Sequence, residues 1–151
     1  MRTLAIDLGS RRIGLALSDE GARFATPLEV LTVNSPDAAI APITEVVRRE
    51  AVKRIVVGLP LNMDDTLGPQ ARATLQWANQ LQRLTNIPVV YVDERLSSFE
   101  AEQQLITRKR AGEKLTRQRK KEQLDAIAAA SFLQSFLDGK LPPIDFAHPP
   151  A

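Results

Sequence analysis

The sequence has no cysteine and a single histidine, His148, among its 151 residues. Disulfide bonds and thiolate metal ligands are therefore excluded, and zinc sites built from cysteine and histidine are disfavoured. A chain without cysteine is also typical of a reducing compartment. We therefore expect a cytoplasmic protein.

Long apolar stretches are missing as well. The apolar runs are far shorter than the ~18 residues that a membrane-spanning helix needs. The N-terminal residues lack the charged and apolar regions of a signal peptide, so we expect no membrane association. With 44% apolar and 25% charged residues, the composition is that of an ordinary globular domain. We place one domain at residues 1–140 and expect a loose, proline-rich tail at 141–151.

Acidic residues are scarce in one segment, which carries eight cations and only one acid, Glu113. The cations are Arg108, Lys109, Arg110, Lys114, Arg117, Arg119, Lys120 and Lys121. The segment therefore has a net charge of +7, and the rest of the chain, within a total of +2, carries −5. Such a run is often only a solvated loop. Its concentration on a mildly acidic body favours contact with a polyanion, which we take to be nucleic acid.

The hydrophobic pattern predicts an α/β fold. Strands are expected at residues 3–8, 12–18, 22–33, 54–60 and 89–92, and helices at 35–51, 68–84, 97–110 and 119–137. The first three strands form an antiparallel meander, and the last two follow helical crossovers. The expected structure is a mixed five-stranded sheet, three antiparallel strands then two parallel ones, with helices on both faces and the first strand central.

Acidic residues lie where two of these strands end. Asp7 interrupts the first apolar run, and Asp93 and Glu94 end the last strand. Asp125 lies on the inward stripe of the final helix. Each has a simpler explanation, a turn for Asp7 and helix capping for Asp125. However, the carboxyl ends of parallel strands meet at one edge of a sheet, which would gather these side chains.

Gathered carboxylates repel one another unless a cation lies among them. Oxygen ligands without cysteine favour Mg²⁺ or Mn²⁺. Two such ions would activate a water and stabilise the leaving oxygen of a phosphodiester. The acids and the basic segment together indicate a metal-dependent nuclease.

Four ordered motifs resemble those of the YqgF/RuvX family over about residues 3–138. They are Asp7–Gly14 (DLGSRRIG), Val57–Met63 (VGLPLNM), Asp93–Ser97 (DERLS) and Asp125–Ala129 (DAIAA). The resemblance implies a ribonuclease H-like fold related to RuvC-type Holliday junction resolvases. It implies nuclease action that matures the 5′ end of the small-subunit ribosomal RNA precursor. Resolution of branched DNA is the older proposal, and ribosomal particles are implied partners.

The motifs also imply the catalytic carboxylates, namely Asp7, one acid of the pair Asp93 and Glu94, and Asp125. Ribonuclease H and RuvC-type enzymes carry an acid near the fourth strand, where this chain reads Gly58-Leu59-Pro60. The acid after the fifth strand must replace it, across roughly 10 Å from the first strand. Glutamate reaches further than aspartate, so we prefer Glu94 as the metal ligand and keep Asp93 as the alternative.

Other residues of the motifs are candidates for substrate contact. Arg11, Arg12 and Arg95 would neutralise phosphate charge, although Arg95 could instead pair with Asp93. Asn62 would position a phosphate or simply close its turn. Asp64 is a further candidate ligand in the same loop. We expect Trp77, the only tryptophan, to serve packing rather than base stacking.

Two other classes of function compete with the nuclease. The Asp-x-Gly-Ser turn also resembles the first phosphate loop of actin-like and sugar-kinase domains, but those proteins need a second domain. A non-catalytic RNA-binding or ribosome-assembly factor could keep the same fold. The sequence leaves open RNA or DNA as the substrate and a monomer or a homodimer as the assembly.

Overall fold

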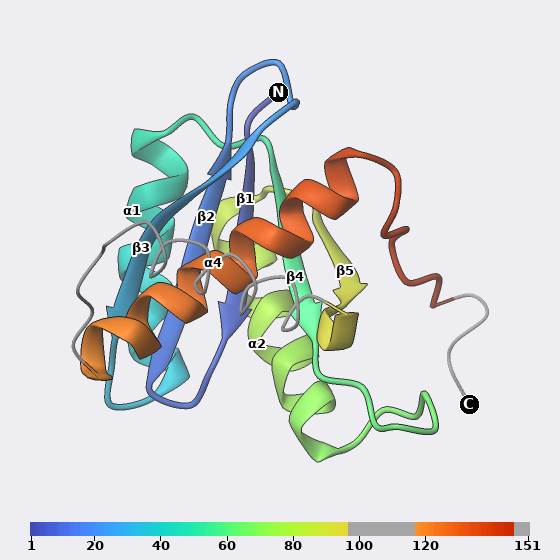
Figure 1. Ribbon diagram of the computed structural model, residues 1–151. Helices are drawn as coiled ribbons and strands as arrows, with labels where there is room; N and C mark the ends of the chain where they lie inside the picture. Colours follow the sequence, from blue (N-terminus) through green and yellow to red (C-terminus); the bar gives the residue numbers. More distant parts are fainter. Residues whose placement is uncertain (97–116, 147–151) are drawn as a thin grey trace.

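The computed structural model describes residues 1–96 and 117–146, and side chains within 1–95 and 124–146. Five strands form one sheet in the order β3-β2-β1-β4-β5 (Figure 1). The strands are β1 (Thr3–Leu8), β2 (Arg12–Ser18), β3 (Ala25–Thr32), β4 (Arg54–Leu59) and β5 (Val89–Asp93). β1–β2 and β2–β3 are antiparallel, and β1–β4 and β4–β5 are parallel. The predicted mixed sheet with a central first strand is confirmed.

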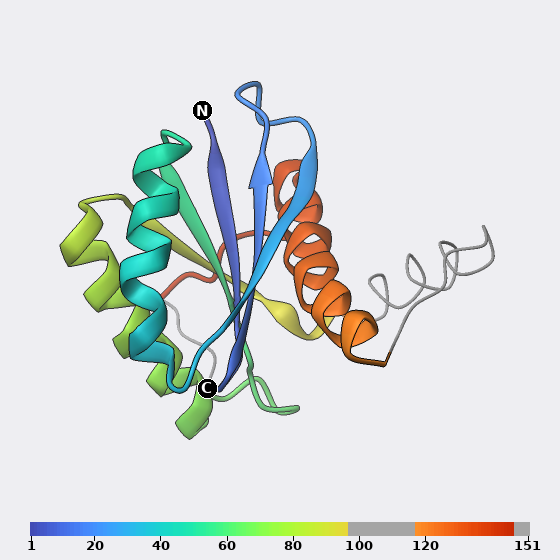
Figure 2. The same ribbon diagram turned by 90° about the vertical axis from the view of Figure 1, so that its left-hand side faces the viewer.

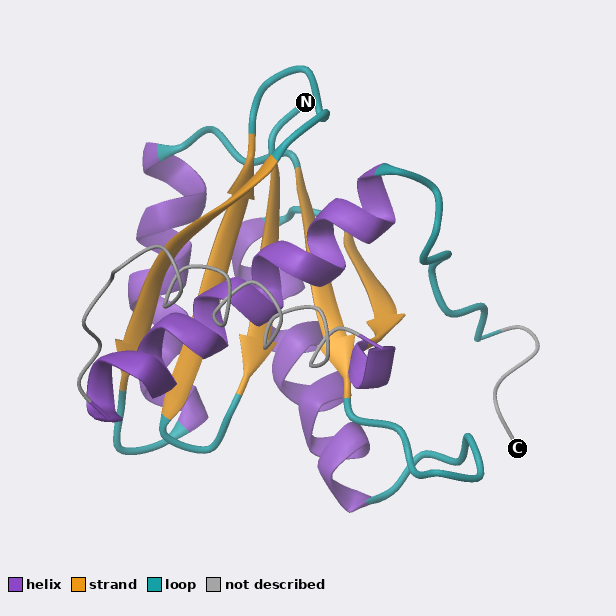
Figure 3. Cartoon of the chain, in the orientation of Figure 1, coloured by secondary structure: helices purple, strands orange, loops and turns teal. Residues whose placement is uncertain are grey.

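Helices cover both faces of this sheet, as predicted. The 3₁₀ turn η1 (Pro36–Ala39) leads into α1 (Ile40–Arg49), and α2 (Pro69–Thr85) lies beside α1 on one face. α4 (Arg117–Leu137) crosses the other face, and a short 3₁₀ turn, η2 (Glu94–Leu96), follows β5 (Figures 2 and 3). The helix predicted at 97–110 lies outside the described residues. Within residues 1–96 and 117–146, no helix is long and apolar enough to cross a membrane.

Strand alternation divides the core into two layers. Leu4 and Ile6 of β1 pack with α1 and α2, whereas Ala5 packs with the α4 side chains. On the sheet face that α4 covers, small strand residues such as Ala5 and Ala16 let this helix approach the sheet closely. Asp7 continues the parity of Ala5 and therefore points to the face that α4 covers.

Trp77 is a packing residue, as expected. Its side chain is only 4% exposed within the core cluster of α1 and α2. Its indole Nε1 donates a hydrogen bond of 2.8 Å to the carbonyl oxygen of Pro36. This bond fixes the start of η1 against α2.

The first part of the proline-rich tail is not loose, contrary to our expectation. Leu141 is buried, and the Ile144 amide donates a 2.7 Å hydrogen bond to the Tyr91 carbonyl in β5. Phe146 packs edge-on against the Tyr91 ring, with 5.4 Å between ring centroids. Residues 141–146 therefore cover the outer edge of β5, which would otherwise present open backbone groups.

Candidate active site

Asp7 lies near the carboxyl end of β1, facing α4, and glycines flank it on both neighbouring strands. Gly14 of β2 is its direct partner in the antiparallel register. On the other side, Gly58 follows Val57, which is the register partner of Ile6 in β4. Asp7 is therefore bordered by two positions without side chains, and other groups can occupy that space.

Gly58 leaves room for Glu94. A Cβ built on Gly58 would lie 2.9 Å from both the Cβ and the Oε2 atom of Glu94. Gly58 pairs with Val92 in β5, so Glu94, two residues later, follows on the same face. The Glu94 side chain extends over Gly58 and hydrogen-bonds the Asp7 carboxylate. Its carboxylate thus occupies the space where a side chain of β4 would stand.

Gly14 in β2 leaves room for the α4 backbone at Asp125. A Cβ on Gly14 would lie 2.1 Å from the backbone oxygen of Asp125, so only glycine lets α4 come this close. Asp125 is nine residues into α4, beyond the first turn, so the alternative of helix capping does not apply. Arg12 Nε lies 3.3 Å from the Asp125 Oδ2 atom.

These carboxylates perturb one another. Burial raises the pKa of Asp7 to about 6, its hydrogen bond with Glu94 opposes that rise, and the charge of Asp125 adds to it. Burial also raises the pKa of Glu94 to about 9, with further contributions from the Asp7 charge, the Asp7 hydrogen bond and the Asp93 charge. The Asp7–Glu94 pair therefore holds one proton at neutral pH, placed between the two side chains.

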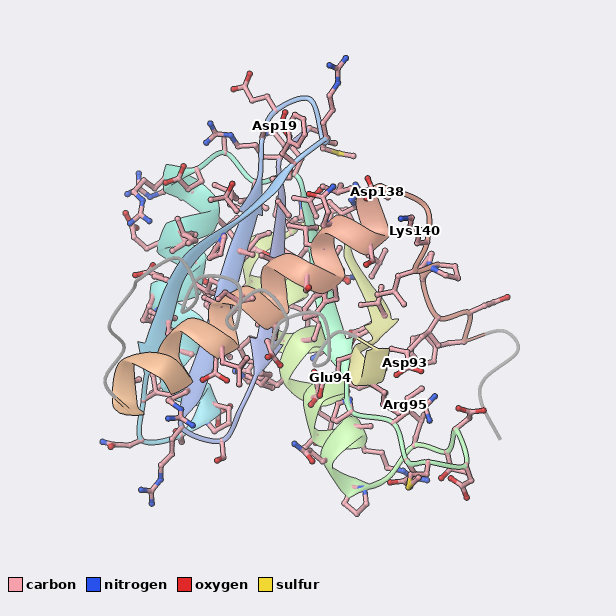
Figure 4. The ribbon with its side chains drawn as sticks, viewed as in Figure 1. Asp19, Asp93, Glu94, Arg95, Asp138 and Lys140 are labelled. Atoms are coloured by element: carbon pink, nitrogen blue, oxygen red, sulfur yellow. The ribbon has the colours of Figure 1, made fainter. Side chains whose placement is uncertain are left out.

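Asp93 is engaged elsewhere. Arg95 Nε lies 2.9 Å and 3.0 Å from the two carboxylate oxygens of Asp93. The same guanidinium bonds the carbonyl oxygen of Asn62 at 2.7 Å and the Asp65 carboxylate. Asp93 and Arg95 lie at the end of β5 beside the loop 60–68 (Figure 4). The pairing with Asp93 is the alternative role that the sequence left open for Arg95. In addition, Arg95 ties this loop to the strand that precedes Glu94, which the sequence did not predict.

Asn62 also has a local structural role in the loop. Its side-chain amide donates to the Thr66 hydroxyl at 2.9 Å, and its backbone bonds Thr66 and Asp65. The Asp64 carboxylate accepts bonds from the backbone amide and hydroxyl of Thr66. These contacts match the turn-closing alternative for Asn62 and engage Asp64 within its own turn.

The basic residues divide into three groups by position. Arg11 is exposed on the β1–β2 turn, and Arg12 lies against Asp125. Arg108, Lys109, Arg110 and Lys114 lie outside the described residues. Arg117, Arg119, Lys120 and Lys121 belong to the first turns of α4, where the backbone alone is described.

The donor set suits a hard divalent cation, since Asp7, Glu94 and Asp125 offer only carboxylate oxygens. Their mutual repulsion is the electrostatic problem that such an ion relieves. In the described part of the chain, no three acidic or histidine side chains are already grouped for metal binding. Among the described side chains, the Arg12 guanidinium is a cation that lies against Asp125, and the proton held by the Asp7–Glu94 pair neutralises one carboxylate.

A family model described as RuvX, Holliday junction resolvase, matches residues 1–139. The chain belongs to the RuvX (YqgF) family. A relative from Anaeromyxobacter dehalogenans is 46% identical over 94% of this chain and all of its own length. Another, from Chloroflexus aggregans, is 44% identical over 93% of this chain and 95% of its own. Both are named "Putative pre-16S rRNA nuclease".

Solved structures place this RuvX-family chain in the ribonuclease H-like fold. Thermus thermophilus RuvC, solved with a Holliday junction, aligns with a TM-score of 0.57 and 21% identity, covering 95% of this chain and all of RuvC. The fowlpox virus resolvase, solved with junction DNA, has a TM-score of 0.55 and 9% identity over 91% of this chain and 99% of its own. The identities are low, so these neighbours establish the fold alone.

The sequence reasoning missed the two glycines that shape the site. The signal was present in the alternation of side chains along each strand. Every second residue points to the face that α4 covers, and these are Ala5 and Asp7 in β1, Val56 and Gly58 in β4, and Val92 in β5 with Glu94 after it. The same parity directs Asp93 away from that face, so it separates the two strand-5 acids without any argument from side-chain length.

Proposed function

We propose that this protein is a divalent-metal-dependent nuclease that hydrolyses phosphodiester bonds of structured nucleic acid. The observation that carries the proposal is the buried Asp7–Glu94 pair with Asp125 close enough to perturb it. Membership in a nuclease family and relatives named for pre-16S rRNA support it. We take the 5′ end of pre-16S rRNA as the processed position and the cytoplasm as the place of action.

The carboxylates of Asp7, Glu94 and Asp125 would hold Mg²⁺ or Mn²⁺, two ions in the full proposal. The metal would supply a bound water of lowered pKa and charge stabilisation at the phosphorus. Asp7 interacts with both other acids, so all three would contribute carboxylate oxygens to the same metal site. Asp93 would serve as an outer partner, since Arg95 occupies both of its oxygens.

The cationic residues would hold the substrate backbone. Arg11 is exposed at the turn beside the carboxylates, and Arg12 lies at the Asp125 side. The basic segment from Arg108 to Lys121 would extend this contact along the nucleic acid. Binding should therefore weaken as salt increases, with a slope set by the number of phosphates contacted.

The test is cleavage of an end-labelled 16S precursor fragment by the full-length protein in Mg²⁺, in Mn²⁺ and in EDTA. We expect metal-dependent cleavage that Asp7→Asn abolishes and that Asp64→Asn, a change in a neighbouring exposed acid, leaves intact. Cleavage by Asp7→Asn equal to the wild type would refute the assignment. RNA binding without cleavage in either metal would favour a non-catalytic assembly factor.

A second candidate is the resolution of branched DNA, favoured by the description of the matching family model. A four-way DNA junction offered beside the RNA precursor separates the two candidates. Symmetric nicking of the junction at rates well above precursor cleavage would favour the resolvase.

A further inference from the structure

A cavity of about 520 Å³ lies on the face of the sheet opposite the carboxylates. It is bounded by the β1–β2 turn at Leu8–Ser10, by Pro36 and Asp37 of η1, and by one side of α2. Its volume lies within the range of small-molecule sites. The cavity is separate from the acidic cluster. Leu8 lines the cavity, whereas Asp7 points to the opposite face of β1.

The lining formed by the described residues includes polar groups and no cation. Three amides, those of Gln70, Gln76 and Gln80, project from α2, and Ser10 and Asp37 add a hydroxyl and one carboxylate. A phosphate is disfavoured here, because the one charge on this described lining is negative. Amides both donate and accept hydrogen bonds, which suits the edge of a heterocyclic base.

Part of the lining is apolar, and its one indole ring is held by a hydrogen bond. Leu8, Pro36, Ala73 and Trp77 line the cavity, and the indole is held in place by its bond to Pro36. A wall that is already ordered loses little conformational entropy when a planar ligand enters. The cavity thus combines apolar walls with an amide-bearing rim, which is how nucleobases are bound.

The position of the cavity links it to the nucleic acid. The turn Leu8–Ser10 begins one residue after Asp7, and the exposed Arg11 follows it. A strand whose backbone lies at the carboxylates and crosses this turn would pass Arg11 with its phosphates. The unpaired base of that strand that follows the turn would then reach the cavity, which lies on the other face of the sheet.

We propose that this cavity receives one unpaired nucleobase of the bound strand and that Asp37 selects bases with an exocyclic amino group. Adenine, cytosine and guanine carry such an amine, whereas uracil offers only an N3–H between two carbonyl oxygens, which would repel the Asp37 carboxylate. This inference rests on the proposed function for the presence of a strand. Its test measures binding and not cleavage.

Trp77 is the only tryptophan, so its fluorescence reports on the cavity without a label. We would titrate the full-length protein in EDTA with single-stranded oligoadenylate, with oligouridylate, and with free adenosine. The expected result is a saturable fluorescence change, at least about tenfold tighter for oligoadenylate than for oligouridylate. Free adenosine should bind more weakly than the oligonucleotide, because it lacks the phosphate contacts.

Ala73→Leu would fill the cavity from an exposed helical position with a good helix former. It should reduce oligoadenylate affinity at least about tenfold, while Asn79→Leu, an exposed α2 position outside the lining, should not. Asp37→Asn should remove the preference over oligouridylate and keep the fluorescence response.

Three results would overturn the proposal. They are the absence of any saturable change, wild-type affinity in Ala73→Leu, and equal affinity for adenosine and oligoadenylate, which would make the cavity a site for free nucleosides. If the protein cleaves its substrate but shows no fluorescence change, only the proposal for the cavity is refuted. If the fluorescence change is saturable but no cleavage occurs, only the proposed nuclease activity is refuted.

Discussion

Moving a carboxylate from η2, which follows β5, to β4 tests how the site is assembled. A Cβ on residue 58 would lie 2.9 Å from Oε2 of Glu94. Standard bond lengths put an aspartate oxygen about 2.4 Å from its own Cβ. A carboxylate on Asp at position 58 can therefore come within about 0.5 Å of the Glu94 oxygen, which is the tolerance of a functional site. The double variant Gly58→Asp/Glu94→Gly should restore much of what Glu94→Gly loses.

The magnitudes follow from the contacts. Glu94→Gly should lower cleavage at least about 100-fold, since even outer partners of metal ligands contribute 10- to 100-fold. Gly58→Asp alone should also fail, because its side chain collides with Glu94 and places another acid among the three. The double variant should recover at least about tenfold over Glu94→Gly, since a displacement of 1 Å costs about 100-fold and this one is smaller.

The assay is metal-dependent cleavage, with Mn²⁺ affinity measured by calorimetry on the same samples. Gly68→Ala is the matched control, because its Cβ would lie 2.9 Å from the Asn62 side chain, in the loop and not in the acidic cluster. It should change stability by less than about 1 kcal/mol, because the atoms in the way are the end of an exposed Asn62 side chain that can move, and it should leave Mn²⁺ affinity unchanged. A double variant no more active than folded Glu94→Gly would refute the reasoning.

Three further predictions concern the surroundings of the cluster. The raised pKa values of Asp7 and Glu94 mean that the protonated pair favours the folded state. Its contribution to stability in EDTA should therefore be greatest below about pH 4 and decline as pH rises through about 6 and then 9. Denaturant titrations should show this decline, and an unchanged pH dependence of stability in Glu94→Gln would contradict it. Gly14→Ala should push α4 from the sheet, costing about 1–3 kcal/mol or more in thermal unfolding and weakening Mn²⁺ binding, and unaltered Mn²⁺ affinity would argue against this placement. Arg95→Ala should increase hydrogen exchange in the loop 60–68 and reduce cleavage, whereas an equally protected loop would show that Arg95 does not order it.

The fold was largely predictable because its strands are short and strongly patterned. The buried run of β4 and the meander before it fix the sheet order once the crossovers are right-handed. The least predictable part was residues 141–146. Their prolines suggest a loose segment, but Leu141 and Ile144 have apolar partners on β5, and only the folded sheet edge reveals that contact.

The acids of the site could be predicted from the sequence, but the short distance between Asp7 and Glu94 could not. Asp7, Glu94 and Asp125 could be gathered from strand ends and a helix stripe. Strand spacing alone put the acid after β5 roughly 10 Å from the first strand, and the preference for Glu94 rested only on the longer reach of glutamate. Gly58 removes a side chain from the path, so Glu94 in η2 can lie over β4.

Arg12 is a substrate contact in our proposal, and in the structure its guanidinium lies 3.3 Å from Asp125. Asp7 and Glu94 are hydrogen-bonded to each other, and burial raises the pKa of both. Once deprotonated, the three carboxylates would hold a divalent ion, which would replace Arg12 as the positive charge that faces Asp125. Arg12 would then be available to a phosphate of the substrate. One arginine would thus neutralise carboxylate charge in the metal-free protein and phosphate charge in the complex.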